Sequence, residues 1–346
     1  FVGSRGLGDV YKRQIQNTIQ IPDFVGSTTN LCSPRLGTVA LRCSDDSFAS
    51  RDRMLEEADP VFKPDVYDDF GKWMDGWESK RRRYGGHDWC VIRLGVPGDL
   101  VGLELDTTHF TGNFPPAASV WGSKEEDDPG DASESWEEIL ESVSLGPSKR
   151  HFFDCKQPGP WRWLRLNIYP DGGIARFRAY GNVLPDWSVA GSEIELSGLK
   201  NGGRIVAYND AHYGNVKAVL DSGRGINMGD GWETRRRREP GFDWLLIALG
   251  ALGEANRIEV DTSFYKGNSP AKCSVQAQNV EWGTDQSLIT QSMFWPELLT
   301  PKDLSPDTIH KFELKDLEKI GPVSHVKLNI FPDGGISRFR VFGSKL

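Results

Sequence analysis

An internal duplication constrains the fold of this chain more than any other feature of its sequence. Residues 75–115 align with residues 230–270 without a gap, and 20 of the 41 positions are identical. A later block, residues 166–181, matches residues 328–343 at 12 of 16 positions. The blocks occur in the same order in both halves. Each copy has the length of a domain rather than of a solenoid repeat, so we expect two homologous domains.

The alignment sets the expected domain boundaries. We expect the first repeat at residues 28–181 and the second at residues 198–346, joined by a linker at residues 182–197. Residues 1–27 then form an N-terminal extension. Its first thirteen residues are Gly-rich and aperiodic, and we interpret them as a scar or truncation outside the fold.

The pattern of short strands predicts an all-β fold. Runs rich in β-branched and aromatic residues alternate in polarity and end at Gly or Pro. The 38 Gly, 20 Pro and 12 Trp favour many turns between such strands. Residues 163–180, with the PDGG turn at 170–173, predict a β-hairpin. Short helices are expected at residues 136–143 and 47–57. We therefore expect two tandem jelly-roll β-sandwich domains.

Charge and cysteine usage argue against several classes of function. The 41 Lys and Arg against 49 Asp and Glu give a net charge of −8, which opposes binding to nucleic acid or an anionic membrane. No apolar run approaches the ~20 residues that cross a bilayer. The five cysteines are scattered and never form C-x-x-C, which argues against a disulfide framework or a zinc ribbon. Phosphate-binding loops and G-x-S-x-G elbows are also missing from the sequence.

One motif in each repeat combines acids, an indole and arginines: DGWE-x-x-RRR at residues 75–83 and 230–238. Arginine forks bind carboxylate or ureido oxygens, and Asp or Glu acts as a general base or accepts hydrogen bonds from N–H groups. The motif suits a small ligand with an anionic end and amide-like groups. A surface cluster of salt bridges is an equal alternative. The candidate ligand-binding residues here are Trp77, Arg81, Arg82, Asp230, Trp232, Glu233, Arg236 and Arg237.

A second motif, with the pattern Asp-Thr-x-x-(Phe/Tyr)-x-Gly-Asn, ends a predicted strand in each repeat. It adds Asp106, Asn113 and Asn268 as candidate ligand-binding residues. An Asp-Thr pair also forms Asx or ST turns, so a structural role is the alternative.

Two histidines distinguish the repeats. His87 and His109 of the first repeat are replaced by Phe242 and Phe264 in the second. Imidazole is the usual proton carrier near neutral pH, so we predict that the first repeat carries the acid–base chemistry. A structural role for each histidine is the alternative. The predicted catalytic residues are Asp75, Glu78, His87 and His109.

A metal site is poorly specified. The possible nitrogen and oxygen donors are His87 with Asp88, Asp106 with His109, and Asp210 with His212. None of these pairs has the spacing of a known metal signature, so we assign no metal ligand.

These motifs together resemble the allantoicase family. The segments that carry the resemblance are GKWMDGWESKRR, GHDWCVIRLG, DTTHFTGN, YPDGGIARFRAYG, DGWETRR and DTSFYKGN. The resemblance implies two tandem jelly-roll domains of the galactose-binding-like type, and hydrolysis of allantoate to ureidoglycolate and urea in purine degradation. For some members it also implies a divalent metal such as Mn²⁺. Allantoate carries one carboxylate and two ureido arms on one carbon, which matches a site of arginines, acids and asparagines.

A non-catalytic tandem carbohydrate-binding module is the alternative from a different class. It would use Trp77 and Trp232, which we expect to be exposed, to stack on sugars. The charged motifs argue against this alternative because neutral sugars do not need that charge. Whether one repeat, both repeats or the space between them holds the working site stays open.

The chain ends in Ser344-Lys345-Leu346, the tripeptide of a peroxisomal import signal. We expect it to project from the fold after Gly343, and we expect a peroxisomal address in a eukaryote or otherwise a cytoplasmic one.

The expected partner is a small-molecule substrate rather than nucleic acid or a membrane. We also expect a homo-oligomer.

Overall fold

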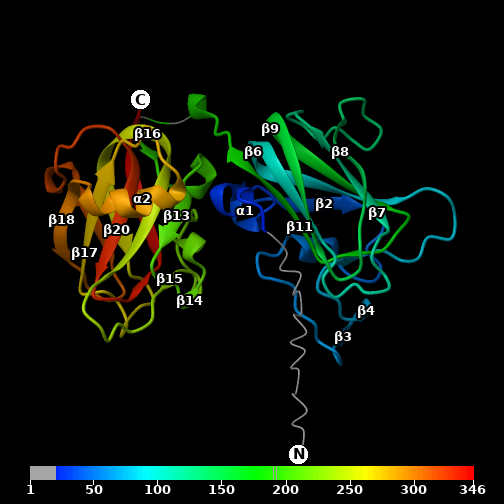
Figure 1. The fold of residues 1–346 in the computed structure, drawn as a ribbon, viewed down its shortest axis with the longest axis horizontal. Coiled ribbons are helices and arrows are strands. Elements are labelled where there is room, and N and C mark those ends of the chain that lie inside the picture. Colours follow the sequence, from blue (N-terminus) through cyan, green and yellow to red (C-terminus); the bar gives the residue numbers. More distant parts are fainter. Residues whose placement is uncertain (1–20, 190, 192) are drawn as a thin grey trace, which may run out of the picture.

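The chain folds into two antiparallel β domains that lie side by side (Figure 1). The computed structural model describes residues 21–189, 191 and 193–346. The expected scar at residues 1–13 lies outside the described residues.

The elements of the first domain alternate strands with short helical turns. The strands are β1 (Thr29–Asn30), β2 (Val39–Cys43), β3 (Tyr67–Asp68), β4 (Gly71–Lys72), β5 (Trp77–Glu78), β6 (Asp88–Asp106), β7 (Ala117–Ser123), β8 (Glu137–Ser144), β9 (Arg150–Tyr169), β10 (Gly173–Ile174) and β11 (Arg176–Val183). The helices are α1 (Phe24–Ser27) and the 3₁₀ turns η1 (Pro34–Leu36) and η2 (Arg51–Leu55).

The second domain follows after η3 (Trp187–Val189) and has the same plan. Its strands are β12 (Ile194–Glu195), β13 (Arg204–Tyr208), β14 (Tyr213–Gly214), β15 (Trp232–Glu233), β16 (Asp243–Asp261), β17 (Lys272–Gln278), β18 (Glu297–Asp303), β19 (Ile309–Glu313), β20 (Val323–Phe331), β21 (Gly335–Ile336) and β22 (Arg338–Lys345). Its helices are η4 (Leu199–Asn201), η5 (Val216–Leu220), α2 (Asp285–Gln291), η6 (Ser292–Phe294) and η7 (Leu314–Asp316).

Two long strands organise each domain. In the first domain the main sheet has the order β1-β11-β6-β9-β7-β8, and β2 also pairs with β6. The register of β6 shifts between Arg93 and Gly98, so its first half pairs with β2 and its second half with β11. In the second domain β16 and β20 take the places of β6 and β9. The expected all-β fold with two tandem domains is confirmed.

The alternating strands bury their apolar faces in the core of each domain. Cys90, Ile92, Leu103 and Leu105 of β6 are fully buried or almost so. Burial of one such large aliphatic side chain stabilises the fold by roughly 1.5–3 kcal/mol. Among the described residues, no helix is long and apolar enough to span a membrane.

The expected hairpin at residues 163–180 is wrong. Strands β9 and β11 do not pair with each other, because β6 lies between them in the sheet. The chain leaves β9 and forms the short strand β10, which pairs with β5. It then returns on the far side of β6. Strand alternation cannot reveal such a crossover, since it does not depend on which neighbour a strand pairs with.

Two further expectations on local structure need correction. The helix expected at residues 136–143 is wrong, because this segment is β8 and pairs with β7 at the edge of the sheet. The only helical element in the segment at residues 47–57 is the 3₁₀ turn η2. A short apolar pattern suits a helix or a strand, and pairing with β7 decides the matter for residues 137–144.

The C-terminal tripeptide does not project from the fold, contrary to expectation. Ser344 and Lys345 belong to β22 and pair with Glu254 and Gly253 of β16. The backbone N–H of Leu346 donates to the carbonyl of Leu252 at 3.0 Å.

An ion pair joins the two domains. Arg35 of η1 pairs with Asp221 of the second domain, and its Nη1 lies 3.4 Å from Oδ1 of Asp230. Asp221 is 8% exposed. Burial raises the pKa of its carboxyl, and the Arg35 guanidinium counteracts part of that rise. The first repeat therefore contributes a charge to a motif aspartate of the second.

Candidate functional site

Three motifs from the two duplicated blocks of the first repeat meet in its fold. Strand β5, from the DGWE motif, pairs with β10, from the PDGG motif. The N–H of Ser79 donates to the carbonyl of Gly172 at 3.1 Å. The N–H of Gly173 donates to the carbonyl of Asn113, from the Asp-Thr motif, at 2.7 Å. Residues that are far apart in sequence thus form one compact site.

The glycine at position 173 makes this close approach possible. A Cβ atom at Gly173 would lie 2.0 Å from the Phe110 ring, which is fully buried. The second repeat has the same contact, since a Cβ atom at Gly335 would lie 2.0 Å from the Tyr265 ring. Only glycine leaves room for these aromatic side chains.

A pocket of about 410 Å³ opens where the blocks meet, and Glu78, Arg81 and Asn113 are among the residues that line it. Glu78 is 9% exposed, and the Asn113 side-chain amide donates to its Oε1 at 2.7 Å. Burial raises the pKa of the Glu78 carboxyl, and the bond from Asn113 opposes that rise. A carboxyl group with a raised pKa suits proton transfer near neutral pH.

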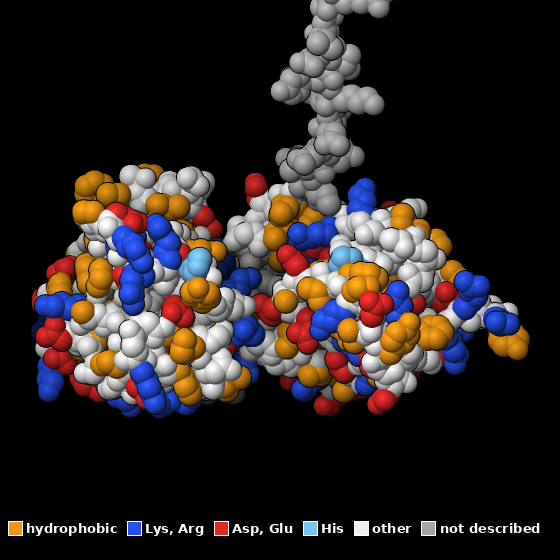
Figure 2. Space-filling view, turned by 90° about the horizontal axis from the view of Figure 1, so that it is seen from below, with side chains coloured by type: hydrophobic (Ala, Val, Ile, Leu, Met, Phe, Trp, Pro, Cys, Tyr) orange, Lys and Arg blue, Asp and Glu red, His pale blue; other side chains and the backbone are white. Residues whose placement is uncertain are grey.

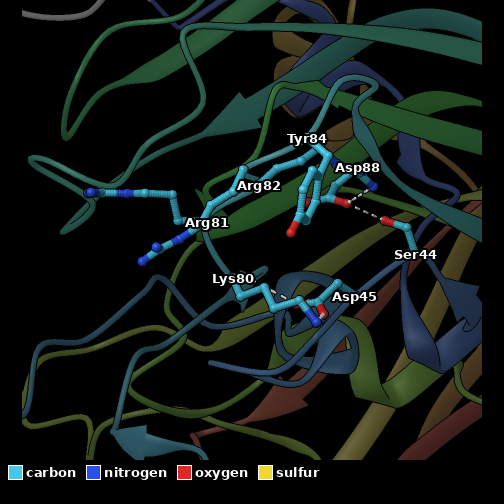
Figure 3. A pocket seen from close by; sticks show the side chains of 8 residues that line it. Ser44, Asp45, Lys80, Arg81, Arg82, Tyr84 and Asp88 are labelled. Carbon is cyan, nitrogen blue, oxygen red and sulfur yellow. Dashed lines mark hydrogen bonds and ion pairs between the residues drawn. The ribbon is translucent and has the colours of Figure 1, made fainter.

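A second pocket, of about 370 Å³, lies beside the first and shares Arg81 with it. Figure 3 shows its two ion pairs: Lys80 with Asp45, at 3.1 Å, and Arg82 with Asp88, at 2.7 Å. Asp88 also accepts a hydrogen bond from the Ser44 hydroxyl at 2.9 Å.

The arginines of the DGWE loop therefore divide into two groups. Arg82 is engaged by two acids, because its backbone N–H also donates to Asp171 at 2.7 Å. In the part of the chain that the structure describes, neither Arg81 nor Arg83 forms an ion pair. Arg81 is thus the arginine in the first pocket whose guanidinium is available to a ligand, while Arg82 shapes the loop. Arg237 of the second repeat is engaged in the same way, by Asp333 and Asp243.

The motif aspartates form ion pairs that hold the loops, and their predicted roles at a ligand stay predictions. Arg176, which is 1% exposed, contacts both carboxylate oxygens of Asp75 at 3.0 Å. The backbone N–H of Val61 also donates to Asp75 at 2.8 Å. In the second repeat, Arg338 contacts Asp230 at 2.7 Å.

The expectation that Trp77 and Trp232 are exposed is wrong. Both indoles are fully buried, and their N–H groups donate to the backbone carbonyls of Asp45 and Asp210 at 2.8 and 2.7 Å. These side chains cannot stack on a sugar or on any other ligand at the surface. The carbohydrate-binding alternative loses the residues on which it relied.

The structure places both histidines outside the two pockets of the first repeat. The His87 ring packs on Tyr169, with 4.7 Å between ring centroids, and its Nε2 lies 3.3 Å from Oδ1 of Asn167. Burial lowers the pKa of His87. His109 Nε2 lies 3.1 Å from the carbonyl oxygen of Pro60. Their predicted catalytic role stays a prediction.

The contact of His109 follows from a difference in loop length. Asp75 follows Asp45 by 30 positions, whereas Asp230 follows Asp210 by 20. The longer segment of the first repeat contains Pro60 and Phe62, and both contact His109. The second repeat has Phe264 at the equivalent position, and that side chain is 38% exposed.

The Asp-Thr motif forms the Asx turn that was its structural alternative. Asp106 Oδ1 accepts the N–H of Thr108, and Asp261 Oδ1 accepts the N–H of Ser263, both at 2.8 Å. Burial raises the pKa of Asp106. Its carbonyl also accepts the N–H of Ala175 at 2.7 Å, which ties the strand end to the PDGG segment.

The described residues do not fit a divalent metal. Residues 21–189, 191 and 193–346 contain no cluster of three or more His, Cys, Asp or Glu side chains that could hold a metal ion. The donors considered from the sequence are directed at protein partners: Asp88 at Arg82, Asp106 at its own turn, and His109 at Pro60. We therefore assign no step to a metal.

Sequence reasoning missed Asp171 and Arg176 and their counterparts Asp333 and Arg338. Asp171 fixes the arginine loop, and Arg176 holds Asp75. Their signal was present, because PDGG-I-x-R-x-R recurs in both repeats. The motif had been interpreted only as a turn between two strands.

The fold and the pocket together define a tandem β-domain protein with a polar pocket lined by charged side chains. Comparison with known proteins identifies the family. The family model described as "Allantoicase repeat" matches residues 29–184 and 194–346, and the chain belongs to the allantoicase family.

Individual relatives agree with this assignment. The chain is 50% identical over 325 residues to "Probable allantoicase 1" of Burkholderia mallei, covering 93% of this chain and 96% of that protein. It is 47% identical over 325 residues to "Probable allantoicase" of Acinetobacter baylyi, covering 94% and 96%. The crystal structure of allantoicase from Saccharomyces cerevisiae superposes with a TM-score of 0.78 at 34% identity, covering 92% of this chain and 93% of that one.

Proposed function

We propose that this chain hydrolyses allantoate to ureidoglycolate and urea in purine degradation, and that the pocket of the first repeat holds the substrate. The observation that carries the site assignment is the meeting of Glu78, Arg81 and Asn113 in one pocket. These side chains match the parts of allantoate: a guanidinium for the carboxylate, and an amide and a carboxyl for the ureido arms.

The position of Arg81 supports its role as the carboxylate-binding residue. It lines both pockets of the first repeat, and in the described chain no acid neutralises it. A guanidinium presents a planar fork that binds a carboxylate through two parallel hydrogen bonds. Bound in this way, the substrate presents its ureido arms toward Asn113 and Glu78.

Glu78 supplies the proton transfers of the hydrolysis. In its protonated form, which burial favours, it donates a proton to the ureido nitrogen as the C–N bond to the central carbon breaks and urea departs. The remaining ureido nitrogen donates its lone pair to the central carbon and so stabilises the positive charge that forms there. Water then adds to that carbon and returns a proton to the Glu78 carboxylate, which forms ureidoglycolate and restores the starting state.

Urea release from allantoate tests this proposal, with Glu78→Gln as the decisive variant. Loss of a general acid–base group typically lowers kcat by ~10²–10⁴-fold. Glu297→Gln, at an exposed position on β18, is the matched control and keeps native turnover. Assays with chelator and with added Mn²⁺ reveal any metal requirement. No urea above a no-enzyme control under any of these conditions contradicts the proposed activity.

The histidines are tested in the same assay. His87→Phe and His109→Phe copy the residues of the second repeat, and we expect turnover within about threefold of native because neither side chain lines the pocket. If either variant loses as much activity as Glu78→Gln, proton transfer belongs to that histidine, as the sequence predicted.

The address and the assembly of the chain are further proposals. We propose a peroxisomal address read from residues 344–346 where the source is a eukaryote, and a homo-oligomer in solution. An import receptor must first release Ser344 and Lys345 from β22. Imaging of a fusion at the N-terminus, with and without the tripeptide, tests the address, and light scattering after gel filtration tests the assembly. A diffuse cytosolic signal contradicts the peroxisomal address. A mass of about 38.6 kDa, that of a single chain, contradicts the homo-oligomer.

A further inference from the structure

The second repeat retains the three chemical groups that define the pocket of the first. The Asn268 side-chain amide donates to Oε1 of Glu233, as Asn113 does to Glu78. The backbone bonds that build the site recur as well. The N–H of Gly335 donates to the carbonyl of Asn268 at 2.8 Å.

The basic loop of the second repeat is also built as in the first. The N–H of Arg237 donates to Asp333 at 2.8 Å, and the N–H of Thr234 donates to Gly334 at 3.1 Å. Arg236 stands at the sequence position that corresponds to Arg81. It is exposed, and within the described ranges it forms no ion pair. The repeat therefore has a guanidinium without an ion pair in the described chain, on the loop that follows the strand of the carboxylate–amide pair.

Burial differs between the two sites. Glu233 is half-buried, whereas Glu78 is 9% exposed. Tyr213, directly across from Glu233 in the ladder between β14 and β15, is 59% exposed and adds a phenol at the surface. The second site is thus more open to water, while its hydrogen-bonding groups are preserved.

Charge also differs. Glu239 replaces Tyr84 in the basic loop, and it pairs with Arg235 at 2.7 Å and approaches Arg237 to 3.6 Å. It neutralises part of the positive charge that the first repeat leaves free. Arg236 keeps a guanidinium that forms no ion pair in the described chain, but the site lacks the enclosed carboxyl group that a proton transfer to departing urea needs.

We propose that the second repeat is a separate binding site for a small carboxylate that carries a ureido group, and that it binds this ligand without hydrolysing it. The inference rests on the proposed function of the first repeat, because the ligand class is taken from the residues that the two sites share. In this arrangement the duplicated chain has one hydrolytic site and one binding site.

Equilibrium dialysis with radiolabelled N-carbamoylglycine tests this inference on the full chain. This probe has a carboxylate and one ureido arm, and it lacks the second arm that leaves as urea. Three variants are compared with the native chain: Arg81→Gln, Arg236→Gln and, as a matched control, Arg238→Gln. Arg238 is an exposed residue of the same loop whose guanidinium forms no ion pair in the described chain. Circular dichroism and thermal melts verify that each variant is folded.

The native chain and Arg238→Gln should bind two equivalents of the probe. The Arg236→Gln and Arg81→Gln chains should each bind one equivalent of the probe with native affinity, at the repeat that is unchanged. Loss of a charge-assisted bond weakens the site that carries the substitution by about tenfold or more. One equivalent in the native chain, abolished only by Arg81→Gln, overturns the second site and leaves the proposed function standing. One equivalent abolished only by Arg236→Gln supports binding at the second repeat and contradicts the assignment of the substrate to the pocket of the first. Absence of binding at 20-fold excess over the KM for allantoate overturns the second site, while the urea assay judges the first independently.

Discussion

Replacing Gly173 with Ala tests whether close packing of the PDGG segment builds the site. The added methyl would lie 2.0–2.1 Å from two ring carbons of Phe110, where ordinary contacts exceed 3.4 Å. Phe110 is fully buried, so the ring or β10 must shift by more than about 1 Å. Overpacking of this kind costs roughly 1–3 kcal/mol. For a domain of this size that cost corresponds to a fall in Tm of about 2–12 °C.

The same substitution should reduce turnover, because Phe110 and Asn113 belong to one loop and β10 pairs with the strand that carries Glu78. Thermal melts and urea release are measured on Gly173→Ala, on Gly267→Ala and on the double variant Gly173→Ala with Phe110→Leu. Gly267, in the second repeat, has no atom within 4 Å of an added Cβ, so this control should behave as the native chain. The double variant should be more stable than the sum of its single changes, since the smaller side chain makes room for the methyl. A native Tm and native activity for Gly173→Ala would refute the packing argument.

The remaining predictions concern charge and pH. Arg81→Lys should raise KM by about tenfold or more in steady-state kinetics, with little change in Tm. Arg82→Lys should lower Tm because it weakens the bond to buried Asp88. Arg93→Lys, at an exposed position on β6, is the control for the steady-state kinetics. Asp75→Asn leaves the guanidinium of Arg176 buried and uncompensated, so urea melts should show a loss of about 3–5 kcal/mol, and a native free energy of unfolding would contradict the structural role. Burial lowers the pKa of His325 to about 4, so the folded state opposes its protonation and stability should fall as the pH drops from 6.5 toward 4, by up to about 3 kcal/mol. Denaturant melts of the native chain and His325→Gln across this range should diverge below pH 6.5, and parallel curves would rule out this histidine as the cause.

The surface charge in the structure agrees with a small ligand rather than a polyanion. Figure 2 shows basic and acidic side chains interleaved over both domains on the face that it presents. Many of the basic groups are paired locally, as Arg42 is with Asp128 and Asp131. On the proposed function, recognition of an anion depends on guanidinium groups such as that of Arg81, which forms no ion pair in the described chain.

The sequence predicted strands well where they depend on local pattern, and less well where they depend on partners. The duplication established two domains, and the alternating runs fall within β6, β9 and β11. The order of pairing was not accessible, because β6 separates two strands that are consecutive in sequence. The same limit applies to residues 137–144, whose edge position in the sheet decides that they form a strand.

The candidate site shows a similar division. Glu78, Arg81 and Asn113 were named from residue type and spacing, and the structure brings them to one pocket. Trp77 was misread because residue type does not report burial, and its indole lies in the core. The ion pair of Asp75 was not foreseen, because its partner, Arg176, stands about 100 positions away in a motif that had been interpreted as a turn. The recurrence of that motif marked Arg176 but did not identify Asp75 as its partner, and the predicted catalytic role of Asp75 stays a prediction.

The ion pair from Arg35 to Asp221 and Asp230 makes the two halves of the chain depend on each other for charge balance. A second repeat expressed alone would lose the guanidinium of Arg35, and a first repeat expressed alone would lose both carboxylates that contact this arginine. Neither half therefore carries the complete set of charges that the tandem chain balances.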